Sequence, residues 1–163
     1  MVLNGGDVPP PSDAEIFIRL GLAMAAGAVL GFERERADKP AGIRTYMLVT
    51  EGAALFMLCA LLLSQALYEQ GRLSDPGRIA STVIQGIGFI AAGVIITTGR
   101  EVIGLTTAAG LWVATAVGLL IGGGFYVLGI GATIATIVGL IVMHRVARIM
   151  GLTRPHRKHP NDP

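Results

Sequence analysis

Charged residues and cysteine are both scarce in this chain. Only 15% of its 163 residues are Asp, Glu, Lys or Arg, whereas 52% are hydrophobic and 23 are glycine. Soluble globular domains carry about a quarter of charged residues, so this composition excludes an ordinary soluble domain. The single Cys59 cannot form an intramolecular disulfide, and its place inside an apolar run predicts a small buried side chain.

The sequence also lacks the residue sets that carry catalysis, metal binding or nucleic-acid binding. It has no Ser/His/Asp set, no Cys/His set and no group of metal ligands at a suitable spacing. Basic residues are not interleaved with aromatics outside the C-terminal tail, which argues against nucleic-acid binding. We therefore expect no enzyme activity, no catalytic residue, no metal and no cofactor.

Long apolar runs with short polar joints occupy most of the chain. A hydrocarbon core about 30 Å thick requires about 20 residues of apolar helix. Runs of this kind cover residues 13–32, 43–68, 78–98, 105–121 and 125–150. The sequence therefore predicts an all-α fold, a polytopic membrane helix bundle with five transmembrane helices at 12–150. Residues 1–11 are expected to be a flexible leader, and 151–163 a basic cytoplasmic tail.

Local signals predict where the first helix starts and stops. Ser12 and Glu15 have the spacing of a capping box, in which the hydroxyl accepts a backbone N–H and the Glu side chain reaches back. Arg19 lies close enough to the membrane edge to extend toward water. Residues 33–42 are expected to form a charged loop. The leader has no Lys or Arg, unlike a secretory signal peptide, so the first apolar run is expected to be retained.

The distribution of Lys and Arg predicts the orientation. Ten of these residues fall on the side of the 33–42 loop and the C-terminus, against three on the other side, which are Arg19, Arg72 and Arg78. Because basic residues concentrate on the cytoplasmic side, we expect the N-terminus outside and the C-terminus in the cytoplasm of a bacterial inner membrane.

Polar residues inside the apolar runs are the candidate functional groups. Arg78, Ser81, Thr82 and Gln85 are spaced to form one stripe on the third helix. The Gln85 amide needs a partner in hydrocarbon, so the stripe serves either as structural glue or as a pathway contact. Glu51 lies seven residues beyond Arg44 on the same face; it is either a paired or neutral structural group or a group that responds to protons or cations.

The segment Gly86-Ile-Gly-Phe-Ile-Ala-Ala-Gly93 superficially resembles a phosphate-binding glycine loop, but no strand precedes it. Helix packing is the better account, because Gly86 and Gly93 share a face and Gly88 with Ala92 has small-xxx-small spacing. The neighbour could be a helix of the same chain, a second copy or another membrane protein. Trp112 is also expected to serve packing.

The charged residues Glu33, Arg34, Glu35 and Arg36 leave a choice between a solvated loop and an interfacial network with Arg44. Together with the stripe, they define a predicted functional polar network. Its members are Glu33, Arg34, Arg44, Thr45, Glu51, Arg78, Gln85, Thr106 and Thr107.

Several motifs in order resemble the transmembrane domain of the bacterial MgtC/SapB family. They are Gly31-Phe-Glu-Arg34, Pro40-Ala-Gly-Ile-Arg-Thr45, Leu48-Val49 with Gly52-Ala-Ala-Leu-Phe56, Arg78-Ile-Ala80, Gly86 to Gly93, and Gly104-Leu-Thr-Thr-Ala-Ala109 with Leu111-Trp112. Many members continue into a soluble ACT-like domain, whereas this sequence stops soon after the fifth run, so we expect a short form. An apolar residue is expected at position 51, where this chain has Glu.

The resemblance implies an inner-membrane protein with about five crossings, linked to growth at low magnesium and to survival inside host cells. Some members restrain the F-type ATP synthase. We therefore expect a non-enzymatic regulator of membrane complexes, surrounded by the lipid bilayer. The expected partners are a second copy, with a dimer favoured, and a membrane protein such as an F-type ATP synthase. The alternative is a small oligomeric ion transporter or channel with Gln85 and Glu51 facing a cavity.

Overall fold

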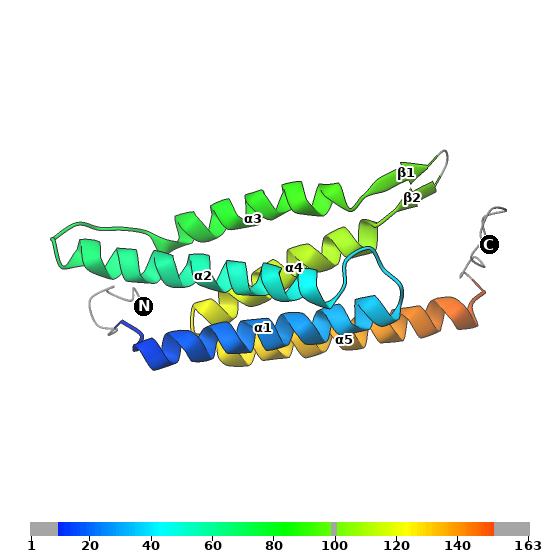
Figure 1. Ribbon diagram of the computed structural model, residues 1–163, viewed down its shortest axis with the longest axis horizontal. Helices are drawn as coiled ribbons and strands as arrows, with labels where there is room; N and C mark the ends of the chain where they lie inside the picture. The colour runs from blue at the N-terminus through cyan, green and yellow to red at the C-terminus, as the bar shows by residue number, and fades with distance from the viewer. Residues whose placement is uncertain (1–9, 99–100, 152–163) are drawn as a thin grey trace.

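The structure, a computed structural model, describes residues 10–98 and 101–151. Five helices run along the molecule in alternating directions, so that α1 begins at one end and α5 finishes at the other (Figure 1). Their bounds are α1 Asp13–Arg36, α2 Ile43–Tyr68, α3 Pro76–Gly93, α4 Leu105–Gly122 and α5 Tyr126–Ile149. Almost all of the expected leader and tail lies outside the described residues.

Four of the described helices are long and apolar enough to cross a membrane: α1, α2, α4 and α5. The helix α3 is not among them, because its 18 residues include Arg78, two hydroxyl side chains and Gln85. The bundle of apolar helices is thus confirmed, together with its membrane character. Five transmembrane crossings are not confirmed.

The helix α4 lies at the centre of the bundle and contacts each of the other four helices. Its sequence suits this position, because more than half of its residues are Gly, Ala or Thr, and small residues allow helices to pack closely in a membrane. Leu111, Ala114, Val117 and Ile121 are at most 1% exposed and form the middle of the two apolar core clusters. By contrast, α5 is largely exposed along its length.

Glycine allows α2 to pack closely between α1 and α4. A Cβ atom on Gly27 of α1 would lie 2.6 Å from the carbonyl oxygen of Tyr46, and one on Gly31 would lie 2.6 Å from the Cα of Ile43. On the other side, a Cβ on Gly122 of α4 would lie 2.7 Å from the carbonyl oxygen of Ala54. Since real Cβ contacts are wider, these helices approach as closely as they do only because the residues are glycine.

The connection between α3 and α4 differs from the expectation of a helix through residue 98 followed by a turn. The helix α3 ends at Gly93, and β1 (Ile96–Thr98) pairs antiparallel with β2 (Glu101–Ile103), with Ile96 opposite Ile103. β-branched residues favour this extended pairing. Gly104 directly precedes α4 and has a φ of 93°, and a Cβ at this position would collide with the Val94 carbonyl oxygen. Both features require glycine.

Three other expectations about the helices need correction. The helix α1 continues to Arg36, so residues 33–36 form its last turn and only 37–42 form the loop. The Ser12 hydroxyl accepts the Glu15 N–H at 3.3 Å as expected, but the Glu15 carboxylate pairs with Arg19 instead of reaching back. Cys59 is exposed on α2 rather than buried, because it points away from the α1 and α4 contacts.

Candidate functional site

One polar cluster closes the end of the bundle where α1 begins. Arg19 forms an ion pair with Glu15 one turn earlier and donates from Nε to the Tyr126 hydroxyl at 3.1 Å. Its Nη1 donates to the Gly122 carbonyl oxygen at 2.8 Å, and Tyr126 also donates to Glu15 at 3.1 Å. Arg19 is only 8% exposed, so the expected extension toward water is wrong. The cluster ties α1 to the α4–α5 connection.

Only one contact of this cluster could be predicted from a local pattern. Glu15 and Arg19 are four residues apart on one helix, which is the spacing for an ion pair. Tyr126 and Gly122 are more than one hundred positions away along the chain, as the sequence separations of 107 and 103 show. No local pattern could have identified them as partners.

A second charged cluster lies at the opposite end of α1. Arg34 is 5% exposed and donates from Nε to the carboxylate of Glu33 at 2.5 Å. Glu35 accepts the N–H of Ile43 at 2.9 Å and so caps the first turn of α2, whose preceding Gly42 has no side chain to do this. The structure therefore brings Glu33 and Arg34 together, but as part of a helix end rather than a free loop.

Arg44 and Arg78 do not join that cluster. Among the described residues, the ion pairs are Arg19 with Glu15 and Arg34 with Glu33. Arg44 is exposed in the first turn of α2, and Arg78 is exposed in the first turn of α3. Since α2 and α3 start at opposite ends of the bundle, the two arginines are far apart (Figure 1).

The start of α4 divides into a buried and an exposed half. Thr107 is 1% exposed, and its carbonyl oxygen accepts from the Tyr46 hydroxyl at 3.5 Å. Thr106, by contrast, is exposed. Trp112, which was expected to pack, is 53% exposed on α4. Thr107 thus fixes α2 to α4, while Thr106 and Trp112 remain at the surface of the chain.

The predicted polar stripe of α3 is split between two sides, because Thr82 lines a recess toward α2 whereas Gln85 faces away from the bundle. Ile87 and Ala91 are the buried residues of this helix, and Gln85, two positions before Ile87, points to the opposite side. The hydroxyl groups of Ser81 and Thr82 donate hydrogen bonds to the Arg78 carbonyl oxygen, at 2.9 and 3.0 Å. Of the four residues of the stripe, Gln85 is thus the one whose exposed polar group points away from α2 and α4 and has no hydrogen bond within the described residues.

Within the described part of the chain, no helix packs closely against Gly86, Gly88 or Gly93 of α3. A Cβ on Gly86, Gly88 or Gly93 would meet nothing within 4 Å. Of the three possible neighbours for this glycine face, a helix of the same chain is thus excluded for the described residues. Gly86 instead borders a recess between α2 and α3.

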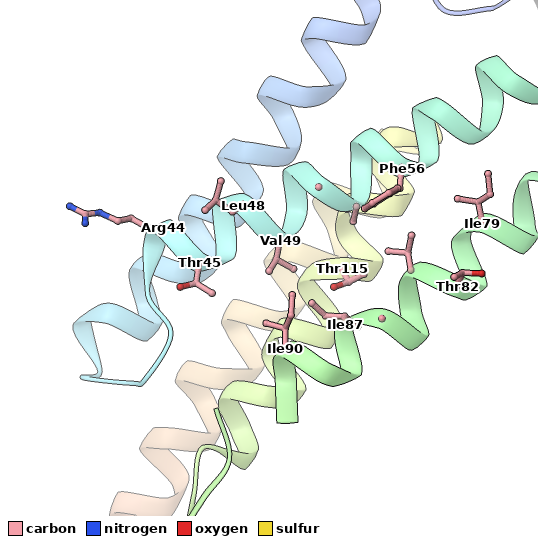
Figure 2. Close-up of a pocket in the computed structure, with 14 residues that line it drawn as sticks. Arg44, Thr45, Leu48, Val49, Phe56, Ile79, Thr82, Ile87, Ile90 and Thr115 are labelled. Atoms are coloured by element: carbon pink, nitrogen blue, oxygen red, sulfur yellow. The ribbon is translucent and has the colours of Figure 1, made fainter. Parts of the chain in front are cut away.

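This recess, the α2–α3 cleft, has a volume of about 670 Å³. Side chains of α2 and α3 form its walls, and Thr115 of α4 lies at its base (Figure 2). Arg44 and Thr45 lie at one end, and Phe56 and Ile79 lie toward the other. Neither Glu51 nor Gln85 is among the lining residues. Glu51 is half-buried on α2 between the exposed Leu48 and Leu55.

Comparison with known proteins supports the resemblance. A model of the MgtC family matches residues 20–149. The chain is similar to the Escherichia coli K12 protein named "Putative magnesium transporter YhiD", with 42% identity over 82% of this chain and 62% of that protein. It is also similar to "Protein MgtC" of Salmonella typhimurium strain 14028s, with 39% identity over 80% of this chain and 53% of that protein.

These matches cover the helical part of the chain. The chain spans between about half and two thirds of the length of these two relatives, at 53% and 62%. No solved structure matches the chain.

Proposed function

Since the chain belongs to the MgtC family, we propose that it is a non-enzymatic membrane protein that regulates other membrane complexes and supports growth at low magnesium. The site of regulation is the outer face of α3, defined here by Ser81, Gln85, Gly88 and Ala92. Its partners are a second copy of the chain and a membrane complex, for which an F-type ATP synthase is the first candidate. The proposal includes α3 as a fifth crossing, with the N-terminus outside.

The observation that carries this proposal is the contrast between two groups of glycines. Gly27, Gly31, Gly118 and Gly122 each face a neighbouring helix so closely that a Cβ would collide with it. Gly88 of α3 faces nothing within 4 Å, as do Gly131 and Gly139 of α5, but Gly88 lies one turn after the exposed amide of Gln85. A bundle that uses glycine for close helix approach thus presents glycine on an uncovered face, where another helix could approach in the same way.

Gln85 strengthens the argument because of its environment. It is exposed on the same face, one helical turn before Gly88 and Phe89, and Phe89 is 88% exposed. An amide that faces hydrocarbon without a hydrogen-bond partner costs several kcal/mol. A polar group from a second helix would remove that cost, which is how polar side chains hold membrane helices together.

The test compares Gly88→Leu with Gly139→Leu. Both glycines face open space, on α3 and α5 respectively, so neither change creates a collision within the chain. We expect Gly88→Leu to abolish self-association and co-purification of the partner complex in mild detergent, and to abolish support of growth at low magnesium. Gly139→Leu should leave all three unchanged. If Gly88→Leu is folded and associates as the unchanged protein does, the outer face of α3 is not the contact surface.

Transport is a second candidate function, and the name of the Escherichia coli relative favours it. Glu51 and Gln85 lie outside the α2–α3 cleft, so an ion path through them would need walls from a second chain. The measurement is ion flux into liposomes containing the purified protein, with Glu51→Gln as the comparison. Flux of Mg²⁺, other cations or protons that depends on Glu51 would support this candidate. Liposomes that contain the protein and show no ion flux would rule out transport.

A further inference from the structure

The α2–α3 cleft is apolar in its chemistry although it contains hydroxyl groups. Thr82 donates its hydroxyl hydrogen to the Arg78 carbonyl oxygen at 3.0 Å, and Thr115 donates to the Leu111 carbonyl oxygen at 3.0 Å. Both donors are therefore used within their own helices. The remaining walls are mainly aliphatic: Val49 and Ile87 point inward (Figure 2), and Val83 also belongs to the lining. A polar ligand or an ion would find few partners along the cleft.

The cleft is also open to the surroundings of the helices. Leu48, Phe56 and Ile90 belong to its lining and are 67%, 57% and 51% exposed. With α3 as a membrane crossing, on which this inference rests, such an opening faces hydrocarbon, so the molecules that reach it are the lipids themselves. Its volume, about 670 Å³, lies in the range of roughly 300–1,000 Å³ typical of small-molecule sites.

A positive charge lies at one end of this apolar cleft. Arg44 is part of the lining, is exposed, and stands at the first turn of α2, beside Thr45 (Figure 2). It takes part in neither of the two ion pairs found among the described residues. An arginine at a membrane surface attracts the anionic headgroups of lipids.

We propose that the α2–α3 cleft binds one anionic phospholipid, with an acyl chain between α2 and α3 and the phosphate at Arg44. The lipid comes from the leaflet on the side of the α1–α2 loop. Length supports this occupant: Arg44 and Phe56 are twelve residues apart on one helix, which is about 18 Å at 1.5 Å per residue. One leaflet of the hydrocarbon core is about 15 Å thick, so the cleft can take a whole acyl chain.

Two glycines make the cleft testable without disturbing the bundle. Gly52 of α2 and Gly86 of α3 both line the cleft, and a Cβ on either would meet nothing within 4 Å. A leucine at either position can therefore occupy the space of the acyl chain. Gly131 of α5 also faces open space but lies outside the cleft, so Gly131→Leu is the matched control.

The experiment uses the full chain in phosphatidylcholine nanodiscs that contain a phosphatidylglycerol with a diazirine in one acyl chain. After illumination, the modified residues are mapped by mass spectrometry. We expect labelling concentrated on cleft residues such as Val49, Val83 and Ile87. Gly86→Leu and Gly52→Leu should each reduce cleft labelling at least several-fold, whereas Gly131→Leu should not.

Arg44→Gln provides a second measurement that does not depend on filling the cleft. Its side chain is exposed, so the change leaves the packing intact. Labelling by the phosphatidylglycerol probe should fall about fivefold, the ratio that corresponds to about 1 kcal/mol for one arginine near the surface. Labelling by the same probe with a phosphatidylcholine headgroup, which has the phosphate but no net charge, should fall less.

Three results would overturn the proposal. One is labelling spread evenly over the exposed residues of α5 and the cleft. Another is cleft labelling that persists unchanged in both leucine variants. The third is cross-linking of a second copy into the cleft through a cysteine placed at Val83, which would show that protein, and not lipid, fills it. None of these results bears on the outer face of α3, which is tested by association and growth.

Discussion

The contacts of α4 lead to a prediction in which one substitution has opposite effects at two positions. Gly118 of α4 and Gly131 of α5 are both helical glycines. A Cβ on Gly118 would lie 2.7 Å from the Cβ of Ala53 and would also collide with the Thr50 carbonyl oxygen. A Cβ on Gly131 would meet nothing within 4 Å. The same glycine-to-alanine change can therefore be compared at a closely packed position, Gly118, and at an open one, Gly131.

The expected magnitudes combine two contributions. Alanine favours a helix over glycine by about 1 kcal/mol, and this gain applies at both positions. Carbon atoms in contact lie about 3.5–4.0 Å apart, so at Gly118 the helices α2 and α4 must separate by about 1 Å. Overpacking of this kind costs about 1–3 kcal/mol. Gly131→Ala should thus be neutral or stabilising, and Gly118→Ala should be less stable than Gly131→Ala by about 1–3 kcal/mol.

The assay is thermal unfolding in one detergent, followed by the loss of helical circular dichroism. For a chain of this size, about 1 kcal/mol corresponds to a difference of about 2–4 °C in Tm. Gly122→Ala, where a Cβ would lie 2.7 Å from the Ala54 carbonyl oxygen, should behave as Gly118→Ala does. Equal Tm values for the Gly118 and Gly131 variants would refute the reasoning that glycine sets the distance between α2 and α4.

Two further predictions concern the ends of α1. Arg19→Met leaves the Glu15 carboxylate without its cation and the Gly122 carbonyl oxygen without a donor, so the free energy of unfolding should fall by about 1–3 kcal/mol. Melting curves check this. The double variant Arg19→Met with Glu15→Gln should recover part of the loss. Glu35→Ala removes the acceptor for the Ile43 N–H, so the free energy of unfolding should fall by about 0.5–2 kcal/mol and hydrogen exchange in the first turn of α2 should become faster. Glu35→Gln keeps an acceptor oxygen and should therefore behave like the unchanged protein.

The sequence was sufficient to predict the helices whose apolar runs are long. The second run was predicted at 43–68 and α2 has those bounds. The prediction for α4 differs from the structure by one residue at one end, and that for α5 by one residue at each end. The errors lie where two principles compete. Residues 33–36 are charged, which suggests a loop, but Glu and Arg are good helix formers and continue α1. Residues 96–98 are apolar or β-branched, and they pair as a strand instead of extending α3.

The candidate sites were less predictable because they depend on which helices meet. The spacing of Glu15 and Arg19 was readable, but their contact with Tyr126 follows from the packing of α1 against α5. Similarly, the stripe through Gln85 was readable as a stripe, yet its direction depends on Ile87 and Ala91 facing the bundle. The cleft could not be predicted at all, because it is the space that two helices leave between them.

The position of α3 relative to the core connects these observations. Apart from Ile87 and Ala91, its described side chains are exposed or half-buried, although its outer face carries Gln85. Turning the Gln85 face of α3 toward its own bundle would give the amide hydrogen-bond partners, yet α4 contacts the face of Ile87 and Ala91 instead. Packing within the chain therefore covers Ile87 and Ala91 and leaves Gln85 and Phe89 exposed together on the outer face. If a second helix covers this face as proposed, its contacts stabilise the assembly and not the isolated chain.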